Sequence, residues 1–549
     1  MDNQRLIFFV ILSFSILLLW DSWQKEQQPA KPVQKAPSTT SVRSDAQTPQ
    51  LSQASIPSGT VVAEGKPENL LSGNRIKIQT DVYKAEIDTI GGDLRSLALL
   101  KHHEADDKTK PFVLYEDKGP RINIAQSGLI GDGLPNHKQV YTSQASAYSI
   151  GETDKQLQVR LSWSDAAGIS VNKIFTFYRS SYLIDITYEI SNLSGNRITP
   201  HAYYQWLRDG QAPIGDPKFV TTYTGPAIYT DKEKFQKVDF SDIDKGKEKY
   251  PKQSSDGWVA MLQHYFFSAW LPAENVQREF YAKKIGNLYA AGVIIPVGIV
   301  EPGAKSSTKM VLYAGPQEQD NISTLAPGLD LVVDYGMLTV IAVPLFWIVQ
   351  LIFKFVQNWG IAIILLTILI KLAFYPLSAK SYRSMAAMRI VSPKLQKLKE
   401  QFGDDRQRLH QAMMELYKTE KINPLGGCLP VVVQMPVFIA LYWVLLYSVE
   451  MRQAPFMAWI QDLSAPDPYY ILPIIMGITM LVQTKLNPTP PDPIQAKVMM
   501  MMPIIFSVFF FFFPAGLVLY WVVNNVLSIA QQWQITRTIE NARADKGHG

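Results

Sequence analysis

The sequence predicts a polytopic α-helical membrane protein with six spans, a large extracytoplasmic all-β sandwich domain and a cytoplasmic helical hairpin. Three observations lead to this fold class. Apolar runs long enough to cross a bilayer are confined to the N-terminus and to the last two fifths of the chain. The middle of the chain alternates apolar and polar residues with the two-residue period of half-buried strands. Lys and Arg gather in one polar stretch between two apolar runs.

The N-terminal segment predicts a membrane anchor followed by a tether. Residues 6–20 are apolar and follow Arg5, and no small-x-small cleavage site comes directly after them. We therefore expect residues 1–23 to form an uncleaved signal-anchor transmembrane helix rather than a removed signal peptide. Residues 24–65 are rich in Pro, Gln, Ser, Thr and Ala without apolar periodicity, which predicts a disordered tether.

Residues 66–330 are expected to form the β domain. Strand-like alternation is clear in residues 77–83, 156–163 and 182–190, and Gly-containing turn signals separate such runs. One large antiparallel sandwich fits this length better than two small domains. Cys428 is the single cysteine, so the domain does not depend on an intramolecular disulfide.

The β domain carries no pattern that indicates catalysis. The contiguous residues His102, His103, Glu104, Asp106 and Asp107 lie between lysines and predict a solvated loop rather than a metal site, because neighbours in sequence rarely converge on one ion. The chain has no HExxH, P-loop, GxSxG or CxxC motif. We therefore expect no enzymatic activity, metal or cofactor. The net charge of +5 is too small to indicate nucleic-acid specificity.

The membrane half begins at residue 331. Residues 331–356 contain an apolar run that is interrupted by Pro344 and almost abuts the next run, so we expect an interfacial amphipathic helix. Residues 357–535 should form a core with five transmembrane helices, which makes six with the anchor. The expected spans are residues 359–375, 428–449, 469–486 and two within 496–535, where Pro514 and Gly516 mark a turn.

Residues 380–421 predict the cytoplasmic helical hairpin. This stretch contains ten cations and five acids, and by the positive-inside rule it is cytoplasmic. Apolar residues at helical spacing lie on both sides of residues 403–405, where Asp404 or Asp405 can cap the second arm. A solvated helix pair and a docking platform for a partner fit this pattern equally well. The same rule places both termini and the tail, residues 536–549, in the cytoplasm and the β domain outside.

Lys371 is the one cation inside the apolar run of residues 359–375. A charged residue there is costly, so it faces a hydrated cavity or a partner helix, or its stem reaches the interface about 6 Å away. Thr367, one turn earlier, and the amides Gln434, Asn524 and Asn525 on other spans favour a shared polar cavity. Met499–Met502 and Phe509–Phe513 form a soft apolar surface, suited either to lipid or to varied apolar segments.

Four motifs in order carry a family resemblance: Asn423–Cys428, Gln434–Pro436, Asp467–Pro473 and Gly516–Trp521. In these the whole chain closely resembles the YidC family of bacterial membrane protein insertases, in its Gram-negative form with a large periplasmic domain. The resemblance implies an inner-membrane insertase and chaperone. Its positively charged groove, open to cytoplasm and lipid but closed outward, holds the polar part of a nascent protein, whose transmembrane segment leaves along the third and fifth spans.

The resemblance assigns roles to particular positions. It implies that Lys371 supplies the groove charge, where the family usually has Arg, and that Thr367, Gln434, Asn524 and Tyr520 line the groove. It implies a substrate slide of apolar residues, namely Met435, Met499, Met502, Phe506 and Phe509. The implied partners are nascent membrane proteins, the Sec translocon with its accessory proteins, the ribosome, the signal recognition pathway and the lipid bilayer. The tail after Gln534 is short and nearly balanced in charge, which argues against strong ribosome binding through it.

Two other functions compete with insertion. A solute transporter with an outer capture domain would fit the architecture, but transporters usually show repeated halves, and these spans show none. A membrane-anchored carbohydrate enzyme would need an acid and base pair, which the sequence does not offer.

Overall fold

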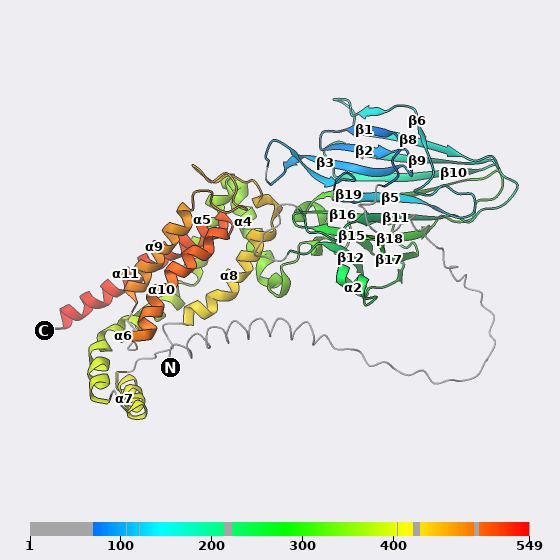
Figure 1. Ribbon diagram of the computed structural model, residues 1–549. Coiled ribbons are helices and arrows are strands. Elements are labelled where there is room, and N and C mark those ends of the chain that lie inside the picture. Colours follow the sequence, from blue (N-terminus) through cyan, green and yellow to red (C-terminus); the bar gives the residue numbers. More distant parts are fainter. Residues whose placement is uncertain are drawn as a thin grey trace, which may run out of the picture.

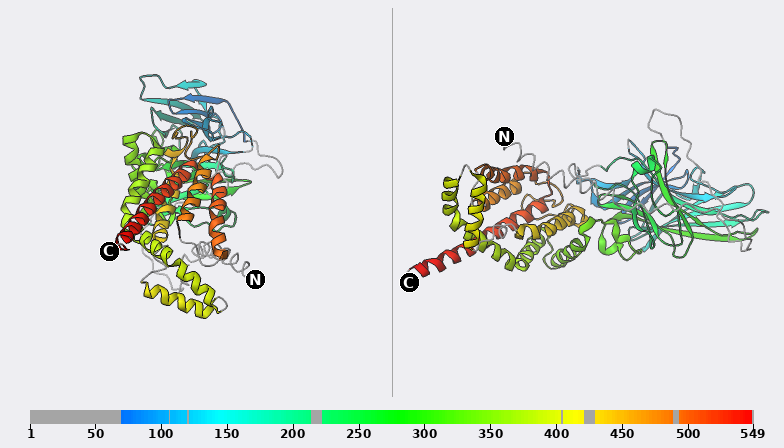
Figure 2. Two further views of the ribbon diagram at one scale, coloured as in Figure 1. Left: turned by 90° about the vertical axis from the view of Figure 1, so that its left-hand side faces the viewer. Right: turned by 90° about the horizontal axis from the view of Figure 1, so that it is seen from below.

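The computed structural model describes residues 70–105, 107–119, 121–213, 222–402, 405–420, 429–487 and 493–547. The predictions for residues 1–23 and 24–65 lie outside the described residues, as do those that involve Asp106, Asp404 and Cys428. The β domain occupies one end of the molecule and the helices of the second half occupy the other (Figure 1). Figure 2 shows the same separation from two further directions.

The β domain is a sandwich of two sheets. The ten-stranded sheet has the order β14 (Gln253–Ser254), β17 (Arg278–Ile285), β18 (Leu288–Pro296), β11 (His201–Arg208), β5 (Asn123–Ile130), β3 (Asp93–His103), β2 (Tyr83–Asp88), β1 (Arg75–Gln79) and β7 (Ala147–Ser149), with β4 (Pro111–Tyr115) paired to β3. The nine-stranded sheet has the order β13 (Lys234–Lys237), β12 (Gly225–Thr230), β15 (Trp258–Gln263), β16 (Phe266–Leu271), β19 (Lys305–Pro316), β10 (Leu183–Asn192), β9 (Ile169–Tyr178), β8 (Gln156–Ser164) and β6 (Thr142–Ser143). A short helix, α2 (Phe240–Asp244), joins β13 to β14.

The alternation in the sequence explains the sandwich. Along β10, Ile184, Ile186, Tyr188 and Ile190 are at most 2% exposed and face the core between the sheets, while the residues between them point the other way. The pairing is antiparallel as expected, apart from β1 with the short edge strand β7, which are parallel. This parallel pair at the sheet edge departs from the expected antiparallel sandwich.

The domain core contains one fully buried amine. Lys173 on β9 is 0% exposed, and its Nζ donates to the carbonyl oxygens of Gly91 (2.9 Å) and Ser127 (3.1 Å). Burial lowers the pKa of Lys173 to about 7, and the nearby carboxylate of Asp93 opposes that shift only in part. The sandwich therefore holds a titratable group in its interior.

The second half is helical from residue 319 onward. Its elements are α3 (Gln319–Ile322), η1 (Leu329–Val332), η2 (Gly336–Leu338), α4 (Thr339–Val356), α5 (Trp359–Ala373), α6 (Tyr375–Phe402), α7 (Arg406–Thr419), α8 (Leu429–Tyr447), η4 (Val449–Met451), α9 (Ile471–Leu486), α10 (Pro493–Phe509), η5 (Phe510–Phe512) and α11 (Ala515–Gly547). Asn358 caps α5 by accepting from the backbone N–H of Ile361 (3.0 Å). The break between α10 and α11 falls at Pro514, where the sequence predicts a turn.

Helices α6 and α7 lie side by side as a hairpin at the end of the molecule away from the β domain (Figures 1 and 2). Asp405 caps α7 by accepting from the N–H groups of Gln407 and Arg408, and Lys394 forms an ion pair with Glu420 at 2.5 Å. α6 follows α5 after one residue, with a bend of 67°. The sequence predicted a span at residues 359–375 and a separate hairpin at residues 380–421. In the structure the first arm of the hairpin begins at Tyr375, directly after the bend.

Among the described residues, Gly336–Val356 is the one unbroken helix long and apolar enough to cross a membrane by length and composition. The bent pair α5 and α6 meets the same test together, and Val433–Tyr447, Ile471–Leu486 and Ala496–Phe512 are shorter apolar helices. The six-span count and the interfacial placement of residues 331–356 stay predictions. On α4 the residues Ala342, Phe346 and Val349 are buried, while Val340 and Trp347 are exposed on the other side.

The β domain packs directly on the helices. One apolar cluster joins residues on the outer face of the nine-stranded sheet, such as Ala260 and Tyr313, to buried residues of α4, α5 and α8. Arg452, in the loop after α8, donates to the carbonyl oxygen of His103, and its guanidinium lies over the rings of Phe112 (5.4 Å) and Phe266 (5.3 Å). These contacts fix the domain against the ends of the helices.

Candidate functional site

A cavity of about 300 Å³ lies among five helices of the second half. Its lining comes from α5, α6, α8, α9 and α11, so residues more than 150 positions apart in the chain meet there. The lining residues are Lys371, Ser378, Ser381, Tyr382, Met385, Gln434, Met435, Phe438, Met480, Gln483, Thr484, Asn487, Tyr520, Trp521, Asn524, Asn525 and Ser528. Lys371 is the one charged side chain among them, and the part of the chain that the structure describes contributes no carboxylate to the lining.

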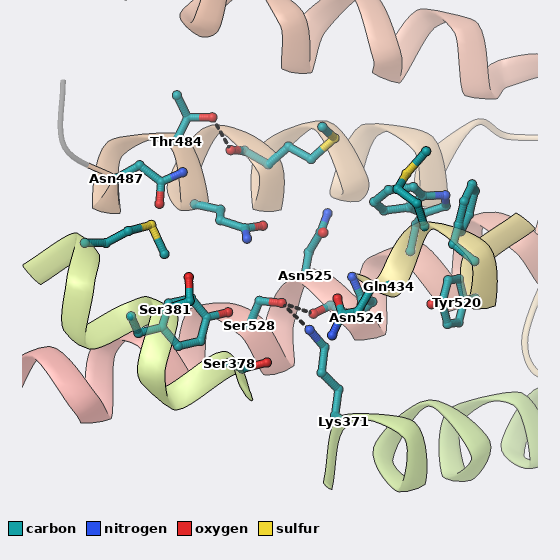
Figure 3. Close-up of a pocket in the computed structure, with 17 residues that line it drawn as sticks. Lys371, Ser378, Ser381, Gln434, Thr484, Asn487, Tyr520, Asn524, Asn525 and Ser528 are labelled. Carbon is teal, nitrogen blue, oxygen red and sulfur yellow. Dashed lines mark hydrogen bonds between the residues drawn. The ribbon is translucent and has the colours of Figure 1, made fainter. Parts of the chain in front are cut away.

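Lys371 points into the helix cluster rather than outward along its own helix (Figure 3). Its side chain is 4% exposed, and Nζ donates to Oγ of Ser528 on α11 at 2.7 Å. Ser528 Oγ in turn donates to the backbone carbonyl of Asn524 at 2.7 Å. The serine hydroxyl thus accepts a hydrogen bond from the ammonium and donates one to a helix carbonyl, which holds the ammonium against α11.

Polar side chains form the walls on both sides of this charge. Asn525 donates to Oγ1 of Thr479 (3.2 Å), so α11 and α9 are joined by a hydrogen bond next to the cavity. Within the described residues, Nε2 of Gln434 and Nε1 of Trp521 are buried and have no hydrogen-bond partner. Unpaired buried donors are costly, and a polar ligand or water that enters the cavity satisfies them.

The cavity is closed toward the β domain by an apolar plug. We use this name for Ile363, Leu366, Leu441, Val444 and Val518, which lie nearer the β-domain ends of α5, α8 and α11 and are all 0% exposed. The cavity residues lie nearer the opposite ends: Lys371 is three residues before Phe374, the C-cap of α5, and Asn487 caps the C-terminus of α9. The polar space therefore belongs to the half of the helix cluster that carries the α6–α7 hairpin.

The structure brings most of the predicted groove residues together. Lys371, Gln434, Asn524 and Tyr520 all line the cavity, and so does Met435. Thr367 does not line it. Its side chain is 1% exposed, and its hydroxyl donates to the carbonyl of Ile363 in its own helix at 2.7 Å.

The predicted slide residues of α10 lie outside the cavity lining. Met502, Phe506 and Phe509 are 38%, 37% and 50% exposed, so they form an outer apolar surface, and Met499 is half-buried. Met435 of α8 is 46% exposed and is also part of the cavity lining. Met435 thus belongs both to the cavity lining and to the outer surface of α8.

Sequence reasoning missed most of the lining residues, including the α9 side chains Met480, Gln483 and Thr484 and the C-cap Asn487. Ser378, Ser381 and Tyr382 lie in the first turns of α6. The prediction assigned Ser381 and Tyr382 to the polar hairpin of residues 380–421, and Ser378 lies just before that range. Ser528 continues the row of Tyr520 and Asn524 on α11 at a spacing of four residues. That helical spacing was the available signal, since residues four apart lie on one face.

The predicted solvated loop begins later than expected, because His102 and His103 end strand β3, where His103 still pairs with Pro111 of β4. The described residues contain no group of three His, Cys, Asp or Glu side chains that could hold a metal ion. The His102 ring instead packs edge-on against Phe266 at 5.2 Å, and a Glu104 carboxylate oxygen accepts from the N–H of Val113. The end of β3 takes part in the contact with Arg452 through the carbonyl oxygen of His103.

Comparisons with known proteins identify the family. Residues 75–348 match the family described as the YidC periplasmic domain, and residues 337–542 match the family described as 60Kd inner membrane protein. A protein of Methylobacillus flagellatus named membrane protein insertase YidC is 58% identical, and the match covers 100% of this chain and 99% of that protein. A protein of Nitrosospira multiformis with the same name is 55% identical to this chain, and the match covers 99% of each of the two chains.

One solved structure, described as an active YidC insertase with the first transmembrane domain resolved, is also similar. It is 18% identical, covers 84% of this chain and 92% of its own, and has a TM-score of 0.39. The family assignment rests on the matched families and on the relatives above 50% identity. The chain belongs to the YidC family of membrane proteins.

Proposed function

We propose that this chain is a membrane protein insertase and chaperone of the bacterial inner membrane. The polar part of a nascent membrane protein enters the cavity beside Lys371, and its transmembrane segment leaves into the bilayer between α8 and α10. The observation that carries this proposal is a cavity with one cation, no carboxylate among its described lining residues, and unpaired buried donors on Gln434 and Trp521. Such a site suits a transient guest with acceptor groups.

The energetic reason lies in the thickness of the barrier. A polar tail that crosses the full hydrocarbon core of about 30 Å loses its hydration throughout. A polar cavity that reaches partway from one side leaves only the apolar plug to cross. A carboxylate within about 4 Å of an ammonium gains roughly 4 kcal/mol at an effective dielectric constant near 20, which offsets part of the desolvation cost.

The orientation follows from charge. The α6–α7 hairpin carries the excess of Lys and Arg and lies at the far end from the β domain (Figures 1 and 2). By the positive-inside rule the hairpin and the C-terminus are cytoplasmic and the β domain is periplasmic. The cavity then opens toward the cytoplasm and the plug closes it outward, while the exposed side of α4 lies at the outer interface.

The exit path follows the apolar surfaces of α8 and α10. Met435, Met502, Phe506 and Phe509 are exposed and differ in shape, and Met side chains repack easily around varied guests. The clients are nascent membrane proteins that arrive from the ribosome, directly or through the signal recognition pathway, and the Sec translocon with its accessory proteins is the partner for larger clients.

Photo-crosslinking to a stalled nascent chain tests the proposal. A photo-reactive amino acid at Gln434 or Tyr520 lies in the cavity, and one at Ile361, which is 41% exposed on α5, serves as the matched control outside it. The client should crosslink at Gln434 and Tyr520 and not at Ile361. Equal labelling at Ile361, or no labelling at either cavity position, would contradict the proposal.

A further inference from the structure

A second cavity, of about 530 Å³, lies in the β domain. Along β10 and β19, Ile184 and Leu312 point into the sandwich core, while their neighbours Leu183 and Val311 point to the outer face of the nine-stranded sheet and line this cavity. Residues 325–327, on the way from the β domain to α4, form its opposite wall. The result is an apolar floor between a sheet and the segment that leads to the helices.

The wall of this cavity is held in place. The rings of Tyr229 and Trp258 stack with centroids 5.5 Å apart, and Nε1 of Trp258 donates to the carbonyl oxygen of Pro327 at 2.9 Å. Both rings are at most 6% exposed. The segment of residues 325–327 is therefore pinned to the sheet, and the cavity is formed before any ligand arrives, which lowers the entropic cost of binding.

The rim is acidic. Asp231, Asp256 and Glu274 line the cavity, and Asp231 and Glu274 are exposed. Within the described part of the chain, no hydrogen bond or ion pair reaches the carboxylate of Glu274. Asp231 accepts one hydrogen bond, from the hydroxyl of Tyr229 at 3.1 Å. Asp231 and Glu274 thus keep free acceptor positions, whereas both carboxylate oxygens of Asp256 already accept, from the Ser254 hydroxyl and from the backbone N–H of Asp231.

Arg278, the cation among the described residues that line this cavity, binds backbone carbonyl groups. Arg278 is 2% exposed, and its guanidinium donates to the carbonyl oxygens of Val276 (2.9 Å), Gly257 (2.5 Å), Ser255 (3.0 Å) and Ala273 (2.6 Å). These carbonyls belong to the two loops that carry Asp256 and Glu274. Arg278 therefore fixes both loops, and four of its five N–H donors are used by the backbone.

We propose that this cavity binds a peptide segment of a partner protein in which a Lys or Arg stands between apolar side chains. The apolar side chains lie on Leu183, Val311 and Leu271, and the cation meets Asp231 and Glu274 at the rim. Charge complementarity decides the occupant, because anionic lipid headgroups and acidic segments are repelled by the same carboxylates. The proposal goes beyond insertion and does not depend on the cavity at Lys371.

Binding of two matched peptides to the full chain in nanodiscs of zwitterionic lipid tests this inference. The probes are a labelled Leu-Lys-Leu-Lys-Leu peptide and its Leu-Glu-Leu-Glu-Leu counterpart, followed by fluorescence anisotropy. The Asp231→Asn/Glu274→Gln variant removes the rim charge. The Asp132→Asn/Glu152→Gln variant removes the same charge from exposed positions elsewhere on the domain. All four changes are isosteric and exposed, so both variants should fold, and their thermal unfolding midpoints verify this.

The Lys peptide should bind the unmodified chain and the control variant alike, and roughly fivefold more weakly to the rim variant. Its affinity should fall with added salt, and a photo-reactive Leu in it should label residues 272–275 or 325–327. Equal affinity for the rim and control variants, equal binding of the Glu peptide, or labelling elsewhere would overturn the inference. Client insertion by the rim variant should be unchanged, which separates this test from that of the proposed function.

Discussion

Reversing the charge at Lys371 should selectively impair clients with acidic translocated tails. The ammonium is the one charge among the described residues that line the cavity, and it is held by Ser528 at 2.7 Å. The Lys371→Glu variant replaces attraction by repulsion while the surrounding helices keep their polar walls. The effect on a client therefore depends on the client's own charge.

The size of the effect follows from the geometry. A client carboxylate about 6 Å from the ammonium, at an effective dielectric constant near 20, gains roughly 3 kcal/mol. Water that enters the cavity screens much of this attraction. We take about 1.4 kcal/mol as the part that remains, which corresponds to about a tenfold change in the insertion rate. Insertion of a client with an acidic tail should fall about tenfold or more. For a client whose tail has Asn and Gln in place of the acids, the insertion rate should change by less than about threefold, because that tail lacks the charge that Lys371 attracts.

Protease protection of clients in proteoliposomes measures this directly. Lys371→Arg should retain insertion, because it keeps the charge. The insertion rate of Lys371→Met should lie between those of the unmodified chain and Lys371→Glu. Lys380→Glu is the matched control, since Lys380 is exposed on α6 outside the cavity lining. If Lys371→Glu impaired acidic and neutral tails equally, or if Lys380→Glu had the same selectivity, the electrostatic reasoning would be refuted.

Three further changes have definite expected results. Ser528→Ala removes the acceptor of the Lys371 ammonium and should lower the free energy of unfolding by about 1–3 kcal/mol. Its loss of insertion should be smaller than that of Lys371→Met. Unchanged stability and insertion would contradict the positioning role of Ser528. Arg452→Ala removes the contact with the His103 carbonyl and with the rings of Phe112 and Phe266. It should increase proteolytic cleavage between the β domain and α4 several-fold. Substitution of the exposed Arg197 by Ala is the control, and equal cleavage of both variants would show that the contact is dispensable. Lys173 has a folded-state pKa of about 7, below its ordinary value of 10.5, so the unfolded chain binds more protons between these values and stability rises with pH across that window. Denaturant unfolding of the β domain from pH 7 to 9.5 should show this rise, and Lys173→Met should lose it while keeping the fold; a parallel pH dependence in both would exclude Lys173 as the source.

The sequence by itself determined the local elements and flagged the charge. Two-residue alternation placed β8 and β10, because a strand with one buried face must alternate. Pro514 marked the break between α10 and α11, and Asp405 caps α7 as one of two predicted candidates. Lys371 stood out because a cation inside an apolar run needs a polar partner wherever it lies. All these inferences depend on residues close together in the chain.

Only the tertiary structure decided which residues meet that charge. The 67° bend after α5 brings the first turns of α6, including Ser378 and Tyr382, back to the cavity. Thr367 lies one turn from Lys371 but satisfies its hydroxyl within its own helix. The partner that Lys371 does find, Ser528, is 157 positions away. Local periodicity fixes which side of a helix is polar, whereas the packing of the helices against one another selects the partner, and that packing depends on contacts between distant segments.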